Sequence, residues 1–171
     1  MAATHLVIIS DRTALSWVLA EQRMAFPTAR AQVARAIQEG DEVLLYSTRR
    51  CFGSPTRDLG RIIARGSVTS QVRTLDEPVV FGERSFTEGC DLRIHGLAPF
   101  REGLVLRDLV TRLEAFPDPR SWSARMRRPS LALSTADADL LRRRLEPGLK
   151  PYVETVAAYR WPAGDPPARS L

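Results

Sequence analysis

The chain has 171 residues, of which 44% are hydrophobic and 26% are charged. This balance is typical of one soluble globular domain and excludes a disordered or collagen-like chain. The formal net charge is +5, and Lys150 is the only lysine among the 25 basic residues, so the surface is rich in arginine and favours phosphate-bearing partners.

Several classes of protein are excluded by what the sequence lacks. No apolar run approaches the roughly 18 to 20 residues that cross a bilayer, and the run over 6–9 is too short for a signal peptide. Cys51 and Cys90 cannot form a disulfide framework, and His5 and His95 do not stand at zinc-ligand spacing. We therefore expect a cytoplasmic protein without a metal site, a cofactor or a membrane partner.

The N-terminal segment predicts a strand followed directly by a helix. Residues 5–10 form a short β-branched apolar run, and Asp11 begins a set of helix-capping residues. In the helix that follows, Leu15 and Leu19 share an inward face. Trp17 projects from the flank of that helix and is free to line another feature.

The middle of the chain is predicted to be mostly sheet. A helix over 28–39 precedes it, with Val33 and Ile37 turned inward and Gly40 at its left-handed end. Alternating apolar residues then predict strands over 42–48, 60–69, 71–81 and 90–95. A basic polar loop joins the first two strands, and a turn region over 82–89 separates the last two.

The C-terminal part returns to helix. Residues 106–113 repeat apolar side chains at helical spacing, and an arginine-rich loop follows over 120–129. Ser134 begins a last helix that ends before Pro147. The order of elements predicts an α+β fold, with a mixed, mainly antiparallel β-barrel flanked by helices.

Two regions are distinguished along the chain. Residues 1–147 form the predicted domain, and residues 148–171 form a C-terminal extension that is partly helical, over 151–159, and then flexible.

Four motifs carry a resemblance to a known family. They are the opening LVIISDRTALSWVLAEQRMAF, the GDEVLLYS strand at 40–47, GRIIA at 60–64, and the segment from Ser121-Trp122 through Arg127-Arg128 to LALS at 131–134. In this order and spacing, over roughly residues 4–146, the sequence resembles the EVE domain, a PUA-like barrel related to the YTH domain.

This resemblance implies non-enzymatic recognition of nucleic acid. A modified base, methylated or hydroxymethylated, would be flipped into an aromatic pocket between the first helix and the barrel, on either DNA or RNA. By position, Ser10 and Asp11 would contact base edges, Phe26 and Phe81 would be cage walls, and Tyr46-Ser47 would lie on the floor. The chain departs from the family where Phe26 replaces a tryptophan and where Arg128 replaces an acidic group.

The chemistry of these residues fits such a reader and also admits simpler roles. A base taken out of its stack needs aromatic faces and hydrogen bonds to its polar edge. Asp11 is equally well explained as a helix cap, and Trp17 and Phe26 as core residues. Trp122, Arg125, Arg127 and Arg128 either meet phosphates or form a solvated loop that Trp122 anchors to the barrel.

Other functional classes have weaker support. No G-x-S-x-G elbow or glycine-rich phosphate loop is present, so we expect no enzymatic activity. Cys51 lies in sequence beside Arg49 and Arg50, which favours a lowered pKa for its thiol, but no catalytic base accompanies it. The alternatives to a reader are a domain that binds a small molecule or nucleoside and an interaction module with an arginine-rich surface.

Overall fold

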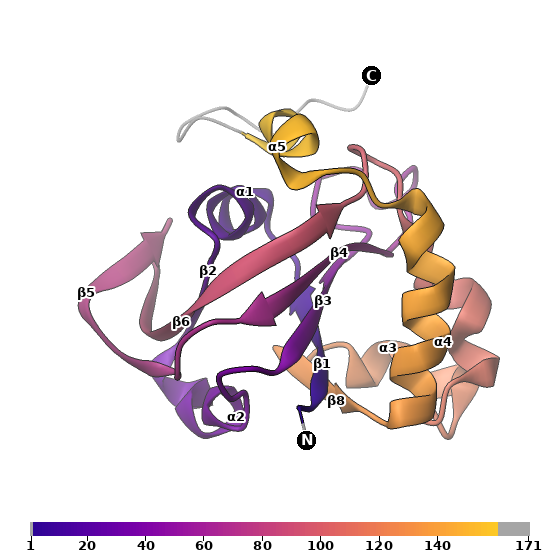
Figure 1. The fold of residues 1–171 in the computed structure, drawn as a ribbon, viewed down its shortest axis with the longest axis horizontal. Helices are drawn as coiled ribbons and strands as arrows, with labels where there is room; N and C mark the ends of the chain where they lie inside the picture. Colours follow the sequence, from indigo (N-terminus) through magenta and orange to yellow (C-terminus); the bar gives the residue numbers. More distant parts are fainter. Residues whose placement is uncertain (1, 161–171) are drawn as a thin grey trace.

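The protein is a curled, mainly antiparallel sheet flanked by helices, and the predicted α+β class is confirmed (Figure 1). The computed structural model describes residues 2–160. The strands run in the order β2-β6-β4-β3-β1-β8, while β5 pairs with β6 and β7 pairs with β4. The bounds are β1 (Thr4–Ile9), β2 (Arg23–Phe26), β3 (Glu42–Ser47), β4 (Arg61–Val68), β5 (Arg73–Phe81), β6 (Arg84–Leu97), β7 (Leu104–Val105) and β8 (Ser130–Leu133).

Ten helical segments surround this half-barrel within the described part of the chain. The α-helices are α1 (Arg12–Glu21), α2 (Ala31–Arg35), α3 (Trp122–Arg125), α4 (Thr135–Leu145) and α5 (Tyr152–Thr155). The 3-10 helices are η1 (Thr28–Arg30), η2 (Leu106–Arg112), η3 (Pro119–Ser121), η4 (Glu146–Gly148) and η5 (Val156–Tyr159). Among residues 2–160, no helix has the length and apolar character needed to cross a bilayer.

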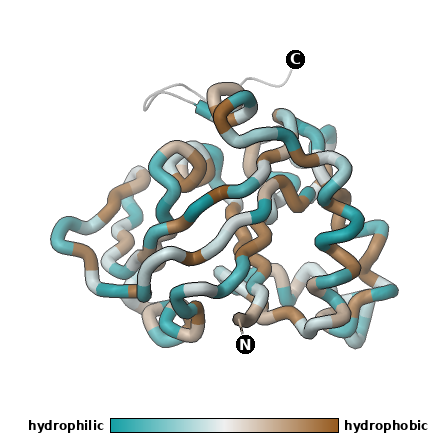
Figure 2. Tube along the Cα trace, viewed as in Figure 1, coloured by the Kyte–Doolittle hydropathy of each residue, from teal (hydrophilic) through white to brown (hydrophobic). Residues whose placement is uncertain are grey.

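The sheet buries both of its faces, which explains why its central strands are continuous apolar runs. Along β3, Val43 and Leu45 belong to one hydrophobic cluster, while Leu44 and Tyr46 belong to the other. Successive side chains of a strand point to opposite faces, so a single strand supplies both clusters. One cluster lies under α1 and the C-terminal segment, and the other lies under η2 and α4. Figure 2 shows hydrophobic stretches both in the strands and in the helices that cover them.

The turn predicted over 82–89 is much shorter than expected. Only Gly82 and Glu83 lie between β5 and β6, because residues 84–89 already belong to β6. A Cβ on Gly89 would lie 2.6 Å from the carbonyl oxygen of Met24, so this position lets β2 approach β6 closely. The resulting β5–β6 hairpin projects from the barrel beside α1 (Figure 1).

The second predicted helix is also shorter than its pattern indicated. It divides into η1 and α2 and ends at Arg35, although Gly40 does adopt a positive φ of 92°. With fewer helical turns, Val33 is 40% exposed instead of buried, while Ile37 is buried as expected.

Three short strands were missed because each lacks a long alternating pattern. β2, β7 and β8 have two to four residues, and their pairing with β6, β4 and β1 is a tertiary property. The predicted helix over 106–113 is the 3-10 helix η2, and the arginine-rich segment contains η3 and α3 instead of forming a continuous loop.

The C-terminal segment packs on the barrel as far as residue 160. Tyr159 is 1% exposed, and its hydroxyl donates to the carbonyl oxygen of Ala98 at 2.7 Å. The hydroxyl of Tyr152 donates to the carbonyl oxygen of Leu19 on α1. The helix expected over 151–159 is present as α5 and η5, and the flexible tail expected after it lies outside the described residues.

Candidate nucleic-acid interface

The polar ends of several strands meet at one edge of the sheet. β1 and β3 are parallel, and Ile9 pairs with Ser47, so the residues that follow them emerge side by side. These include Ser10 after β1 and Thr48 after β3, and the Thr48 amide donates to the carbonyl oxygen of Ile9 at 3.0 Å. Polar residues therefore follow both β1 and β3 at this edge of the sheet.

Two antiparallel neighbours begin at the same edge. β8 pairs with β1, and the amide of Ile8 donates to the carbonyl oxygen of Pro129 at 2.9 Å, which brings the arginine-rich segment alongside. β4 pairs with β3 and begins after Gly60. A Cβ on Gly60 would lie 1.8 Å from the hydroxyl oxygen of Tyr46, so only glycine fits there.

A groove of about 1220 Å³ opens over this edge. One wall is formed by α1, β2 and the β5–β6 hairpin, which contribute Trp17, Phe26 and Phe81. The loop after β3 and the segment before β8 form the opposite side, with Arg49 and Trp122 among their residues. Together with Arg107 of η2, segments from six separate parts of the sequence therefore build a single concave surface.

Most of the residues predicted from the sequence line this groove. The nine that do are Ser10, Asp11, Trp17, Phe26, Tyr46, Phe81, Trp122, Arg127 and Arg128. The structure thus brings together residues that are up to 118 positions apart in the sequence, from Ser10 to Arg128.

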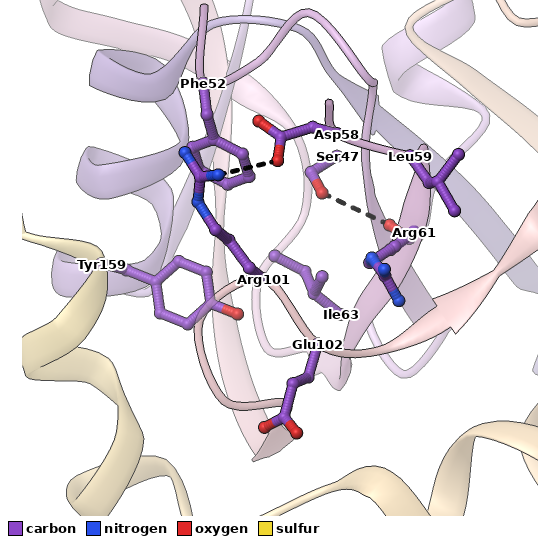
Figure 3. A pocket seen from close by; sticks show the side chains of 9 residues that line it. All are labelled: Ser47, Phe52, Asp58, Leu59, Arg61, Ile63, Arg101, Glu102 and Tyr159. Carbon is purple, nitrogen blue, oxygen red and sulfur yellow. Dashed lines mark hydrogen bonds and ion pairs between the residues drawn. The ribbon is translucent and has the colours of Figure 1, made fainter. Parts of the chain in front are cut away.

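Two predicted residues lie elsewhere. Ser47 is buried on the opposite face of β3 from Tyr46, where its hydroxyl donates to the carbonyl oxygen of Arg61 at 3.5 Å and borders a separate small cavity (Figure 3). Neighbouring side chains of a strand alternate, so Tyr46 and Ser47 point to opposite faces of β3, and Ser47 is not among the residues that line the groove. Arg125, at the end of α3, is exposed and does not line the groove.

The aromatic side chains form a contiguous row on one wall. Trp17 meets Phe81 edge to face with centroids 5.7 Å apart, and Phe81 meets Phe86 at 5.3 Å. The guanidinium of Arg23 covers the Trp17 ring at 5.4 Å. Phe26 is only 3% exposed and belongs to the hydrophobic core. It therefore packs behind this wall, and its ring has little surface left for contact with a ligand.

Asp11 caps α1 and also lines the groove. Its Oδ1 accepts a hydrogen bond from the amide of Ala14 at 2.9 Å, which caps α1. The residue is nevertheless exposed and lines the groove. A carboxylate has a second oxygen, so the cap leaves Asp11 with acceptor capacity for a ligand.

Trp122 both anchors its segment and lines the groove. Its ring meets Phe116 edge to face at 6.1 Å, and it packs against the cluster under η2 and α4. Tyr46 belongs to the same cluster, and burial raises its pKa to about 12. The phenol therefore stays protonated at neutral pH and remains a hydrogen-bond donor.

The groove is strongly basic. Seven arginines line it against two carboxylates, those of Asp11 and Asp58. Within residues 2–160, six of the seven make no ion pair with an acidic side chain, and the Arg107 guanidinium lies 3.8 Å from the carboxylate of Asp108 in an exposed pair. The seven are Arg30, Arg49, Arg50, Arg84, Arg107, Arg127 and Arg128.

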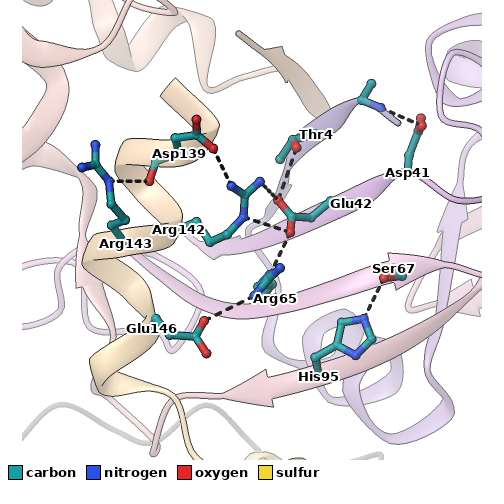
Figure 4. Close-up of polar contacts among 11 residues, drawn as sticks. Thr4, Asp41, Glu42, Arg65, Ser67, His95, Asp139, Arg142, Arg143 and Glu146 are labelled. Carbon is teal, nitrogen blue, oxygen red and sulfur yellow. Dashed lines mark hydrogen bonds and ion pairs between the residues drawn. The ribbon is translucent and has the colours of Figure 1, made fainter. Parts of the chain in front are cut away.

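Arginines on another part of the surface are neutralised. Beside α4, Glu42 accepts hydrogen bonds from Arg65 at 2.7 Å and from Arg142 at 2.7 Å, and Arg142 also contacts Asp139 (Figure 4). Although burial alone would raise it, these guanidinium groups hold the pKa of Glu42 below its ordinary value. Arg65 and Arg142 are therefore neutralised by carboxylates, in contrast to six of the seven groove arginines.

Some lining residues were missed by the sequence analysis. The basic loop after β3 was noticed, but Arg49 and Arg50 were not selected, and nothing in the pattern singled out Arg30, Arg84 or Arg107. Thr48 and Asp58 also line the groove, and one side-chain oxygen of each is buried without a hydrogen-bond partner among the described residues. No local sequence signal distinguishes such atoms, because their isolation depends on how the loop packs.

The expectation of a reactive Cys51 is wrong. Burial, together with the negative charges of Asp11 and Asp58, raises the pKa of its thiol to about 12. Neighbouring arginines in the sequence do not overcome these effects, so the thiol is protonated at neutral pH.

The sequence and the structure were compared with those of known proteins. No model of a known protein family matches the sequence, and no curated protein matches it. Among solved structures, the YTH domain of Mmi1 in complex with RNA is similar, with a TM-score of 0.57 and 7% identity over 85% of this chain and 78% of that one.

Two further solved structures extend the comparison. A hypothetical protein from Leishmania major has a TM-score of 0.55 and 13% identity, over 84% of this chain and 94% of that chain. Rpa0253 from Rhodopseudomonas palustris has a TM-score of 0.53 and 15% identity, over 85% and 94%. At these identities the likeness concerns the fold, and membership of the EVE family stays a prediction. The protein has a YTH-like fold.

Proposed function

We propose that the protein is a nucleic-acid-binding module that holds a single-stranded segment in the groove and stacks one unpaired base against its aromatic wall. The base would be methylated or hydroxymethylated, as the resemblance to EVE domains implies. The proposed activity is binding without chemical conversion of the nucleic acid.

The arginine distribution carries this proposal. A groove with seven arginines and two carboxylates attracts a polyanion, and guanidinium groups without acidic partners are free to form forked hydrogen bonds to phosphate. A protein partner with an acidic surface could also pair with these arginines. Such a partner would not explain why a row of aromatic rings lies beside them.

The aromatic row supplies the second part of the proposal. On the wall nearest α1, the ring of Phe81 contacts Trp17 on one side and Phe86 on the other. Stacking on aromatic side chains offsets the cost of unstacking a base and works for every base, since each has a π-face. The similarity to the Mmi1 YTH domain, solved with RNA, supports RNA as the first ligand to test.

The test is fluorescence anisotropy with labelled 12-nucleotide single strands of RNA and DNA at several salt concentrations. We expect Arg127→Ala/Arg128→Ala to weaken binding to all sequences and to reduce the salt slope by about 1.4, because each phosphate contact to a single strand contributes about 0.7. The matched control is Arg143→Ala/Arg144→Ala on α4, outside the groove. Equal effects of the two double variants would overturn the groove as the binding surface.

Base selectivity is tested separately with the same strands carrying one central modified base. We compare methylated and hydroxymethylated cytosine and methylated adenine with their unmodified parents. A preference of about tenfold for one of them supports a reader, since that ratio corresponds to about 1.4 kcal/mol. Binding without any preference would leave a general single-strand binder.

A further inference from the structure

A buried carboxylate stands at the end of the loop between β3 and β4. The side chain of Asp58 is only 10% exposed, and its Oδ1 accepts a hydrogen bond from Nη1 of Arg101 at 3.0 Å (Figure 3). Its Oδ2 is buried and has no hydrogen-bond partner within the described chain. A buried charged acceptor without a partner costs stability, so its presence in the fold needs an explanation.

The surroundings hold this carboxylate in one orientation. The guanidinium of Arg101 lies 5.3 Å from the ring centroid of Phe100 and 6.0 Å from that of Phe52, so two aromatic faces fix its position. The backbone of Arg101 has a φ of 66°, a left-handed conformation that arginine rarely adopts. Backbone strain at Arg101 and an unpaired oxygen on Asp58 thus occur in the same ion pair.

The position of Asp58 relates it to the groove. Asp58 and Leu59 line the groove, and both also border the small cavity of about 10 Å³ that Ser47 and Tyr159 line (Figure 3). That volume is about the size of a single water-sized group. Asp58 therefore stands between the large groove and a polar recess behind it.

Resting on the function proposed above, we propose that Asp58 determines which base the groove accepts, by accepting a hydrogen bond from an amino N–H of that base through Oδ2. An ionised carboxylate has acceptors only, so it pairs with the amino groups of adenine or cytosine and repels a carbonyl oxygen at the same place. Because Oδ2 is covered in this structure, entry of the base includes a shift of the loop over 48–60.

The chemistry predicts how methylation of the amine is read. A monomethylated amino group keeps one N–H and satisfies Asp58, whereas a dimethylated amino group has none. The ligand class is therefore an unpaired base with a free or monomethylated exocyclic amine. A base whose amine is dimethylated leaves Oδ2 of Asp58 buried without a hydrogen-bond partner, which is the costly case.

The experiment compares single strands that differ in one central base, measured by fluorescence anisotropy. The series are adenine, N6-methyladenine and N6,N6-dimethyladenine, and cytosine with its N4-methyl and N4,N4-dimethyl forms. We expect the wild type to lose at least about tenfold in affinity between the monomethyl and dimethyl members of one series. Similar affinities across both series would overturn the role of Asp58 while leaving the groove as a binding surface.

The variant Asp58→Asn separates hydrogen bonding from the bulk of the second methyl group. Arg101 needs an acceptor, so the amide oxygen turns to it and the amide NH₂ replaces Oδ2. We expect this variant to lose its discrimination against the dimethylated base and to favour a central uracil, which presents carbonyl oxygens. If the variant discriminated between the monomethylated and dimethylated bases as the wild type does, the size of the second methyl group alone would explain the selectivity, and the proposal would be overturned.

The control is Asp139→Asn, which removes another arginine-paired carboxylate, 2.7 Å from Arg142 and outside the groove. It is expected to keep the base preference of the wild type. If Asp58→Asn does not fold, as circular dichroism would show, a central uracil is compared with cytosine on the wild type. Uracil has a carbonyl oxygen in place of the amine and no added bulk, so equal affinities for the two would overturn the proposal. If the wild type binds no single strand at all, the proposed function fails, and this inference fails with it.

Discussion

Trp17 and Phe81 touch edge to face, with ring centroids 5.7 Å apart and planes inclined at 73°. A base sandwiched between two parallel rings needs them about 7 Å apart, twice the contact distance of carbon atoms. These two rings therefore do not enclose a base in the described conformation. They present an aromatic surface to the groove, against which one base would stack under the proposed function.

The first prediction concerns this surface. We expect Phe81→Ala to lower affinity for single-stranded oligonucleotides about tenfold, because stacking on an aromatic side chain contributes about 1–3 kcal/mol per base. Anisotropy titration measures the change. Val80→Ala is the matched control, since Val80 is the neighbouring residue of β5 and is 62% exposed. Unchanged affinity in Phe81→Ala would remove this ring from the site.

The second prediction separates Phe26 from the half-buried rings of Trp17 and Phe81. Phe26 is 3% exposed and packs in the cluster under α1, so Phe26→Ala should lower the free energy of unfolding by about 3–5 kcal/mol. Urea denaturation measures this, with Phe26→Leu as a milder replacement that keeps most of the buried volume. A loss below about 1 kcal/mol for the alanine variant would contradict a core role and favour a free cage wall.

The third prediction tests the two roles of Asp11. Asparagine caps a helix about as well as aspartate, whereas alanine costs about 0.5–2 kcal/mol. We therefore expect Asp11→Ala to be less stable than Asp11→Asn, which should match the wild type in thermal denaturation. We also expect Asp11→Asn to alter base preference, because the groove loses a charged acceptor. An Asp11→Asn variant with wild-type base preference would leave Asp11 as a cap alone.

The fourth prediction concerns stability at low pH. Burial of Asp41 tends to raise its pKa, but hydrogen bonds from the amides of Gln38 and Ala3 and from His5, at 2.8 Å, lower it below the ordinary value of 3.8. A carboxyl whose pKa is lowered by folding stabilises the protein fully above that ordinary value. This contribution is lost as the pH falls from 3.8 through the folded-state pKa.

We therefore expect Asp41→Asn to show a weaker dependence of unfolding free energy on pH between about 5 and 2 than the wild type does. Urea denaturation at a series of pH values measures it. The control is Asp76→Asn, since Asp76 is exposed and outside this network. If Asp41→Asn kept the full pH dependence, other carboxyl groups would account for it.

The sequence predicted well where one segment carried its own pattern. The strands at β1, β3 and β4, the helix after Asp11 and the helix after Ser134 all have regular apolar spacing with capping or turn residues at their ends. Such local signals need no partner to be recognised. Elements as short as β2 and β8 have no pattern of their own and form because β6 and β1 offer them an edge.

The residues of the candidate site also divide into those that the sequence predicted and those that it did not. The resemblance carried by the motifs, with the arginine-rich loop, selected nine residues that line the groove, including residues as distant as Asp11 and Arg128. Ser47 was misplaced although alternation along β3 already separates it from Tyr46. Arg30, Arg84 and Arg107 were not selected, because each lies in a segment that reaches the groove only through the curl of the sheet.

By itself, the sequence determined the fold class, the basic character of the chain and the residue types available for stacking and for phosphate, because composition and periodicity are local properties. The tertiary structure alone decided which arginines lack an acidic partner, that Cys51 is inert, and that Asp58 is buried with one oxygen unpaired. These properties depend on distances and burial between segments remote in sequence, and such distances exist only once the sheet has closed around its two cores.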